Sequence, residues 1–153
     1  HDVGALIVFE RETKLGEISK TGTIIDAIVT QEMISNIFFP KAPMHDGAAI
    51  VRNGRMLGAG CMLPLSRNIN LSRDLGMRHR AGIGMSENSD AVVIAVSEET
   101  GQISLAINGV LTRDYTRMKL KYALEKEIFY EDPDYDKSNK KGISSIIGRR
   151  KKK

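Results

Sequence analysis

Three short polar clusters border apolar segments of this chain, and their side chains are of the kinds that bind metal ions and phosphates. They are His45-Asp46-Gly47, Arg78-His79-Arg80 and Ser97-Glu98-Glu99. Carboxylates suit a hard divalent cation, whereas guanidinium groups bind phosphate oxygens through paired hydrogen bonds. Together the three clusters indicate nucleotide chemistry.

Asp46 stands at the mouth of an apolar run over residues 48–51, shortly after Pro43. Proline ends the preceding segment because it has no N–H, and Gly47 lets a ligand or a second backbone approach closely. A carboxylate in such a place is costly unless a metal ion, a cation or a substrate hydroxyl pairs with it. The dipeptide alone is more typical of a simple turn, so this interpretation depends on the other clusters.

Each of the other clusters also has a plain structural interpretation. Arg78-His79-Arg80 could bind phosphate at the start of a helix, or it could be a solvated basic turn or pair with a nearby acid. Ser97-Glu98-Glu99 could share a divalent ion with Asp46 at the end of a strand, or it could be a polar hairpin loop. A lone histidine such as His45 is more often a hydrogen-bonding partner than a metal ligand.

The composition predicts one soluble globular domain. The chain has 153 residues, 41% of them hydrophobic, and its single cysteine excludes an intrachain disulfide. The sequence has no run of 18 apolar residues, so no transmembrane helix is expected. The missing initiator Met indicates an excised fragment.

The formal net charge of +4 comes from the C-terminal end, where eight basic residues lie from Lys137 onward. We therefore predict a domain over residues 1–130 and a basic, flexible tail over residues 131–153. Such a tail could touch nucleic acid or an anionic membrane, but a solvated end is the more ordinary interpretation. No nucleic-acid partner is expected.

Apolar runs and turn signals alternate along the chain in a way that predicts strands mixed with helices. Fully buried strands are expected over 3–9 and 91–96, and a hairpin is expected around Asn53-Gly54, whose residues tolerate positive φ. A half-covered strand is expected over 102–107, and helices over 31–38, 78–86 and 112–129. The last helix has apolar residues on two nearly opposite faces, which predicts a bend or a partner. The fold class is α/β, with a mixed parallel and antiparallel central sheet flanked by helices.

The order of these motifs resembles the diadenylate cyclase (DAC) domain, from about residue 4 to residue 113. The resemblance rests on His45-Asp46-Gly47-Ala48, the segment Cys61-Met62-Leu63-Pro64-Leu65-Ser66, Arg78-His79-Arg80 and Ser97-Glu98-Glu99-Thr100-Gly101. It is most similar to the membrane-anchored CdaA type, in which transmembrane helices precede the domain.

The resemblance implies a DAC-type fold and the condensation of two ATP into cyclic di-AMP, with release of two pyrophosphates. It also implies a transient face-to-face homodimer that uses Mn²⁺, Mg²⁺ or Co²⁺. The full-length protein would lie at the cytoplasmic face of the membrane, and by analogy its partners would include a YbbR-domain regulator and a phosphoglucosamine mutase.

The resemblance also implies roles for individual residues. Catalytic roles fall on Asp46, Arg78, His79 and Arg80. ATP contacts fall on Gly47, Ala48, Met62, Leu63, Met77, Arg78, His79, Ser97 and Glu98. Metal binding falls on Asp46, Glu99 and His45.

Two positions depart from the family pattern and bear on how the base is recognised. Met77 stands where many relatives have Thr, and Met62 stands where many have Tyr. Two functions of other classes stay open: a non-catalytic adenine-nucleotide sensor and a basic-tailed nucleic-acid binder.

Overall fold

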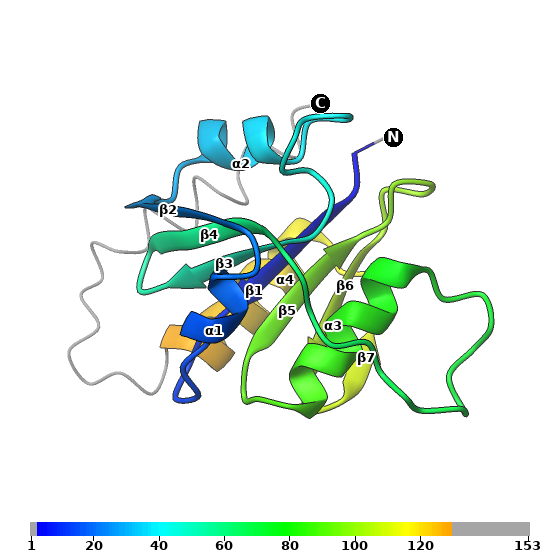
Figure 1. The fold of residues 1–153 in the computed structure, drawn as a ribbon. Coiled ribbons are helices and arrows are strands. Elements are labelled where there is room, and N and C mark those ends of the chain that lie inside the picture. Colours follow the sequence, from blue (N-terminus) through cyan, green and yellow to red (C-terminus); the bar gives the residue numbers. More distant parts are fainter. Residues whose placement is uncertain (1–2, 130–153) are drawn as a thin grey trace.

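A mixed sheet of seven strands forms the centre of the protein, in the order β2-β4-β3-β1-β5-β6-β7 (Figure 1). The computed structural model describes residues 3–129, so the predicted tail lies outside the described residues. The elements are β1 (Ala5–Phe9), α1 (Gly16–Ser19), β2 (Thr23–Ile28), α2 (Gln31–Ile37), β3 (Ala48–Arg52), β4 (Arg55–Cys61), α3 (Met77–Glu87), β5 (Val92–Val96), β6 (Ile103–Ile107), β7 (Val110–Thr112) and α4 (Arg117–Leu124), which continues as the π-helical segment η1 (Glu125–Phe129).

Strand β1 is the central strand of the sheet. It pairs in parallel with β3 and antiparallel with β5, and the other neighbouring strands pair antiparallel. All five of its residues are buried, as the continuous apolar run predicts for a strand covered on both faces. The predicted mixed sheet is therefore confirmed.

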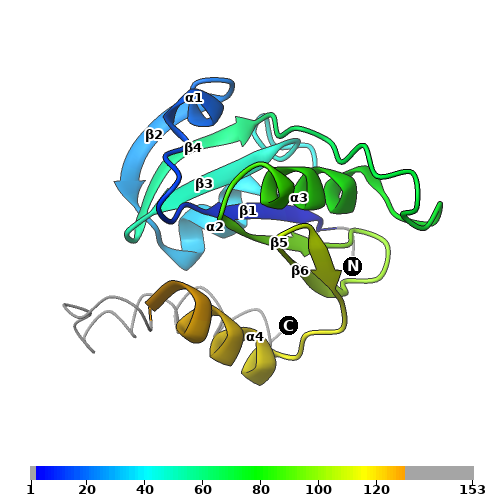
Figure 2. The same cartoon turned by 90° about the horizontal axis from the view of Figure 1, so that it is seen from below.

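The helices cover the two faces of the sheet in separate layers (Figure 2). One core contains alternate residues of β1, Ala5, Ile7 and Phe9, packed with residues of α2 and α4. The other contains Leu6 and Val8, packed with residues of α3. Side chains alternate between the faces of a strand, so one short segment contributes to both cores.

Local signals in the sequence place two elements correctly. Thr30 begins α2, because its Oγ1 accepts a hydrogen bond from the N–H of Met33 at 3.1 Å. Asn53 and Gly54 have φ values of 48° and 76°, and they join β3 to β4 as a hairpin.

Two expectations at the C-terminal side are wrong. Strand β6 is not half-covered: Ser104, Leu105 and Ala106 are buried, because helices cover both faces of the sheet there. The last helix begins at Arg117 rather than at Thr112, because Thr116 caps it and the preceding residues form β7.

The two apolar faces of α4 have different surroundings. Leu120 and Leu124 are buried in the core, whereas the side chains of Met118 and Tyr122 are 72% and 70% exposed. The helix also changes to π-helical geometry after Leu124. None of the helices in the described part of the chain has the length and apolar character of a membrane-spanning segment.

Candidate active site

The sheet brings the three polar clusters to one edge. Asp46 and Gly47 directly precede β3, whereas Ser97 directly follows β5. Because β1 is parallel to β3 and antiparallel to β5, the starts of β1 and β3 and the end of β5 share an edge. Figure 1 shows the start of α3, which carries Arg78, at the same end of the molecule.

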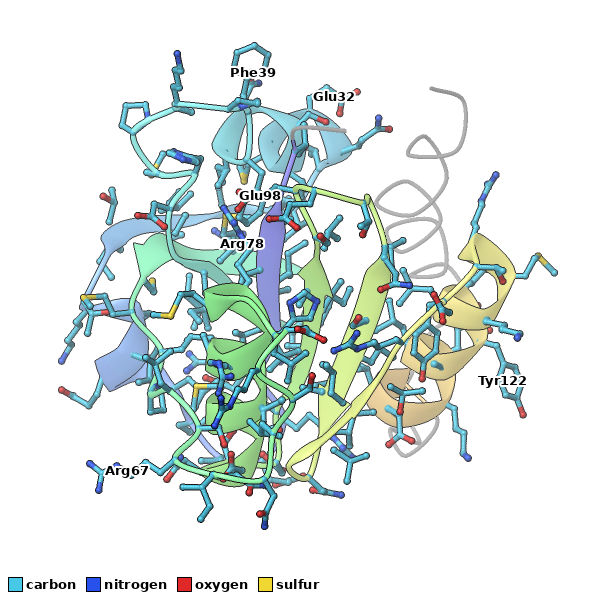
Figure 3. The ribbon with its side chains drawn as sticks, turned by 90° about the vertical axis from the view of Figure 1, so that its right-hand side faces the viewer. Glu32, Phe39, Arg67, Arg78, Glu98 and Tyr122 are labelled. Atoms are coloured by element: carbon cyan, nitrogen blue, oxygen red, sulfur yellow. The ribbon has the colours of Figure 1, made fainter. Side chains whose placement is uncertain are left out.

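Arg78 links two of the clusters. Its Nη1 donates a hydrogen bond to Oε2 of Glu98 at 2.8 Å, and the two side chains point toward one another in Figure 3. The guanidinium also lies against the backbone of Gly4, where an added Cβ would come within 2.7 Å of Cζ of Arg78. Its Nε is buried and has no hydrogen-bond partner among the described residues. Arg78 is thus held at the edge, while its Nε donor has no partner among the described residues.

His79 sits beside it in the first turn of α3, and its Nδ1 is likewise buried without a partner in the described part of the chain. Burial lowers the pKa of the imidazole, and the positive charges of Arg113 and Arg78 lower it further. The imidazole is therefore neutral at pH 7, with one nitrogen that donates and one that accepts. Gly76 caps this helix without a side chain, so the first N–H groups of α3 remain available to an anion.

Arg80 turns to its own loop instead of joining Arg78 at the edge. Its Nε donates to the carbonyl oxygen of Leu75 at 3.3 Å, and its Nη2 donates to that of Ser72 at 3.0 Å. These bonds tie the loop before α3 to the helix. The structure therefore shows Arg80 bonded to the loop before α3, and its contact with phosphate stays a prediction.

The carboxylate of Asp46 is exposed, and no described residue donates a hydrogen bond to it. The expectation of a costly buried charge is wrong, because water reaches the group. Gly47 has a φ of 106°, and a Cβ there would come within 2.8 Å of the carbonyl oxygen of Cys61. Only glycine fits this close turn, and the turn fixes the position of Asp46 relative to the start of β3.

The expected metal set does not form a cluster of protein ligands. Among residues 3–129 no group of three or more His, Cys, Asp or Glu side chains could hold a metal ion. His45 uses its Nδ1 in a hydrogen bond of 2.7 Å with the carbonyl oxygen of Ala42. The donor set at this edge instead suits an ion such as Mg²⁺, which binds through one or two carboxylates and completes its shell with phosphates and water. Asp46 and Glu99 are exposed carboxylates of this kind.

Apolar side chains flank the charged groups. Met62 and Met77 are 72% and 66% exposed. Leu63, which was also expected to contact ATP, is half-buried. Ala48, which was expected to contact ATP, is fully buried, because its methyl group belongs to the core beneath α3.

The turn after β5 is held by its own side chain. Oγ of Ser97 accepts hydrogen bonds from the N–H groups of Glu99 and Thr100, both at 3.3 Å. The turn is therefore preorganised, and it presents Glu98 to Arg78.

Two further residues at this edge, Gly4 and Arg113, were not predicted as site residues from the sequence. Gly4 carries no signal beyond its place in an apolar run, and its close contact with Arg78 depends on the fold. Arg113 follows β7 and acts electrostatically on His79. A strand of three residues is too short to show a periodic pattern, so the position of Arg113 could not be inferred.

The chain was compared with known protein families and structures. Residues 1–111 match the family described as DAC, DisA bacterial checkpoint controller nucleotide-binding. The chain is 47% identical over 125 residues to a cyclic di-AMP synthase, CdaA, of Bacillus subtilis, which covers 82% of this chain and 46% of the relative. It is 43% identical over 126 residues to a diadenylate cyclase of Listeria monocytogenes, which covers 82% and 46%.

Solved structures agree with these matches. A crystal structure of DacA from Staphylococcus aureus, in a double-mutant form, superposes with a TM-score of 0.81 at 43% identity, covering 84% of this chain and 85% of that one. A hypothetical membrane-spanning protein from Bacillus cereus gives 0.72 at 44% identity, covering 75% and 56%. The chain spans about half the length of the curated relatives it matches. By both sequence and structure, this chain belongs to the DAC family.

Proposed function

We propose that this chain is the catalytic domain of a diadenylate cyclase, which converts two ATP into cyclic di-AMP and two pyrophosphates. The observation that carries the proposal is that an acid and basic groups lie together at one edge of the sheet. A free carboxylate, Asp46, lies there together with buried nitrogens of Arg78 and His79 that have no partner among the described residues. Relatives named diadenylate cyclase supply the identity of the reaction.

The order of the strands suggests how one ATP lies along the edge. Met62 and Leu63 follow β4, Asp46 precedes β3, and Arg78 lies against the start of β1. Adenine would then contact the methionine side, the ribose would lie near Asp46, and the phosphates would lie near Arg78. Methionine sulfur contacts aromatic rings favourably, which compensates for the tyrosine of many relatives.

In the proposed reaction, the 3′-oxygen of each ATP forms a bond to the α-phosphorus of the other. At each of the two phosphorus atoms the bond to the bridging oxygen breaks, one pyrophosphate leaves, and the proton of the attacking hydroxyl passes to a base. Asp46 orients the hydroxyl or accepts its proton, while Arg78 and His79 stabilise charge on the phosphates. A bound Mn²⁺, Mg²⁺ or Co²⁺ would supply further charge neutralisation, with Asp46 and Glu99 as its protein ligands.

Two copies of the chain are needed for this reaction. Each copy of the chain carries one set of these residues, yet the product joins two ATP, so in this proposal a second copy faces the first across a two-fold axis. We propose a transient homodimer within a membrane-anchored parent protein. A YbbR-domain regulator and a phosphoglucosamine mutase are further proposed partners.

The direct test is to incubate the chain with ATP and Mn²⁺ and to resolve the products by mass spectrometry. The proposal predicts cyclic di-AMP and pyrophosphate. ATP that binds but is returned intact would instead indicate a nucleotide sensor. Salt-sensitive RNA binding that is lost when the chain is cut before Lys137 would indicate a nucleic-acid binder.

The dependence of specific activity on enzyme concentration tests the face-to-face arrangement. Weak pairing predicts activity per molecule that rises with concentration and then reaches a plateau. A constant specific activity down to nanomolar protein, from a species that sediments as a monomer, would overturn the two-copy mechanism.

A further inference from the structure

Arg113 lies at the same edge of the sheet as the candidate site, on the side away from Asp46. It directly follows β7, which pairs antiparallel with β6 through Leu105 and Thr112. Strand β6 in turn pairs antiparallel with β5, with Ile103 opposite Val96. The end of β7, the start of β6 and the end of β5 therefore share this edge, and Ser97 follows β5 directly.

Arg113 is also on the face of the sheet that carries α3. Leu111 packs in the core beneath α3, and side chains two residues apart in a strand point to the same face. The helix α3 contacts β7 directly. One step past the last pair of the ladder, Arg113 lies opposite Ser104, whose Oγ is buried and has no partner among the described residues.

The backbone around Arg113 is fixed from the adjoining turn. The side-chain amide of Gln102 donates a hydrogen bond to Asp114, and the N–H of Tyr115 donates to the carbonyl oxygen of Ile103 at 3.1 Å. Asp114 has a φ of 66°, in the left-handed region, which gives a sharp bend directly after Arg113. The arginine is thus carried by a preorganised segment.

The charge around Arg113 favours an anion. Its side chain is exposed and makes no hydrogen bond or ion pair with any residue in 3–129. Its positive charge acts on His79, where it contributes to the lowered pKa of the imidazole. Arg78 lies beyond His79 and has one acid partner, Glu98. Arg113 makes no ion pair with a described residue, so two guanidinium groups, Arg113 and Arg78, flank the start of α3, and together they can bind an anion that is longer than a single phosphate.

The strand spacing gives the span of this edge. The strands β3, β1, β5, β6 and β7 are neighbours in that order, so the start of β3 and the end of β7 are separated by roughly 19 Å at the usual spacing. A nucleotide whose ribose lies near Asp46 can approach Arg113 only with its terminal phosphates. The first N–H groups of α3 lie between the two ends.

We propose that Arg113 is a further substrate-binding residue, which binds the β- and γ-phosphates of ATP and then the pyrophosphate that leaves. This inference rests on the proposed function for the identity of the nucleotide. A guanidinium suits the task because it binds phosphate oxygens through two parallel hydrogen bonds and stays charged at any working pH.

Calorimetric titration of ATP, AMP and inorganic pyrophosphate into the full chain tests the inference, with Arg113→Gln, Arg113→Lys and the control Arg67→Gln. Arg67 is also exposed, and Figure 3 shows it at the end of the molecule opposite Arg78 and Glu98. We expect Arg113→Gln to weaken ATP and pyrophosphate binding roughly tenfold to hundredfold, and to leave AMP binding unchanged. Arg113→Lys should lose less affinity for ATP and pyrophosphate than Arg113→Gln does. Arg67→Gln should bind all three ligands as the unaltered chain does.

An unchanged affinity for ATP and pyrophosphate in Arg113→Gln would overturn the inference, as would an equal loss for AMP. Equal losses in Arg67→Gln would overturn it too, because they would reflect net charge rather than position. The proposed function can fail separately. If the chain binds pyrophosphate through Arg113 but makes no cyclic di-AMP from ATP, the role of Arg113 is supported and the cyclase activity is rejected.

Discussion

The two edges of the central sheet differ in how completely their buried polar groups are paired. At the end of β1, the buried carboxylate of Glu10 accepts hydrogen bonds from Nε and Nη2 of Arg52 at 2.5 and 2.8 Å and from the N–H of Leu15 at 2.8 Å. Asp90 accepts two backbone N–H groups there, at 2.9 and 3.0 Å. At the start of β1, nitrogens of Arg78 and His79 are buried without partners among the described residues.

This difference separates stability from function within one sheet. A buried polar group without a partner costs about 1–3 kcal/mol, so it persists where a ligand supplies the missing bonds. The paired edge stabilises the fold, because its carboxylates are satisfied by the chain itself. The other edge, called the unpaired edge after the two nitrogens of Arg78 and His79, lacks part of this stabilisation, and in the proposed function ATP would supply the missing hydrogen bonds.

The largest expected effect is the loss of turnover in Asp46→Asn. The carboxylate is exposed and unpartnered in residues 3–129, so its removal leaves the fold intact. We expect the rate of cyclic di-AMP formation to fall about 10²–10⁴-fold, because the amide cannot accept the hydroxyl proton and binds a cation more weakly than the carboxylate does. ATP affinity should stay within a few-fold of the unaltered chain.

Asp74→Asn is the matched control, since Asp74 is also an exposed acid and lies in the loop before α3. It should leave the rate unchanged. A rate in Asp46→Asn close to that of the unaltered chain would remove Asp46 from the mechanism.

At the paired edge, Glu10→Ala should lower stability while the site survives. The side chain of Glu10 is 0% exposed and that of Arg52 is 37% exposed, so the loss leaves a half-buried guanidinium without its acid. We expect the free energy of unfolding to fall by about 2–4 kcal/mol in urea titrations. Glu12→Gln, an exposed neighbour, should change it little. If folded Glu10→Ala also lost ATP affinity by a comparable free energy, the two edges would not have separate roles in stability and in ligand binding.

The parts of this arrangement that could be predicted from sequence are those set by local pattern. The apolar run of β1 predicts a strand covered on both faces, and Asn53-Gly54 predicts its hairpin. The polar clusters were correctly expected at strand ends and at a helix start. Their meeting at one edge follows from strand pairing, which the sequence does not display.

Side-chain direction within a motif was harder to predict. Arg78, His79 and Arg80 are consecutive in a helix, so each points about 100° away from the one before it. The three side chains therefore leave the helix in different directions, and Arg80 bonds to its loop while Arg78 bonds to Glu98. Arg113 was missed because its neighbours come from distant parts of the chain.

Gly4→Ala should disturb the unpaired edge by a smaller amount. The new Cβ would come within 2.7 Å of Cζ of Arg78, the mobile end of a long side chain, so the guanidinium moves and the backbone stays. We expect its bond to Glu98 to break and the rate to fall about tenfold, with an unchanged melting temperature. Gly16→Ala is the matched control, since nothing lies within 4 Å of its added Cβ. A loss of stability without a loss of rate would show that Gly4 serves the fold alone.

The smallest effect is a pH dependence of stability that the unpaired edge confers through His79. Its pKa is lowered in the folded chain by burial and by the charges of Arg113 and Arg78. As the pH falls through the ordinary value of about 6.5, the unfolded chain takes up a proton that the folded chain refuses. The free energy of unfolding should therefore decline as the pH falls from about 7.5 to 5.5.

Urea titrations across this range check the sign, and His79→Gln should remove most of the decline. Glu10 and Asp90 do not interfere, because their hydrogen bonds outweigh burial and lower their pKa values, so their contributions are lost only in more acidic solution. Arg113→Gln should reduce the decline in part, since burial remains after the charge is gone. Parallel pH profiles in the unaltered chain and His79→Gln would mean that the imidazole does not feel the charges around it. The contrast between the edges would then rest on hydrogen bonding alone.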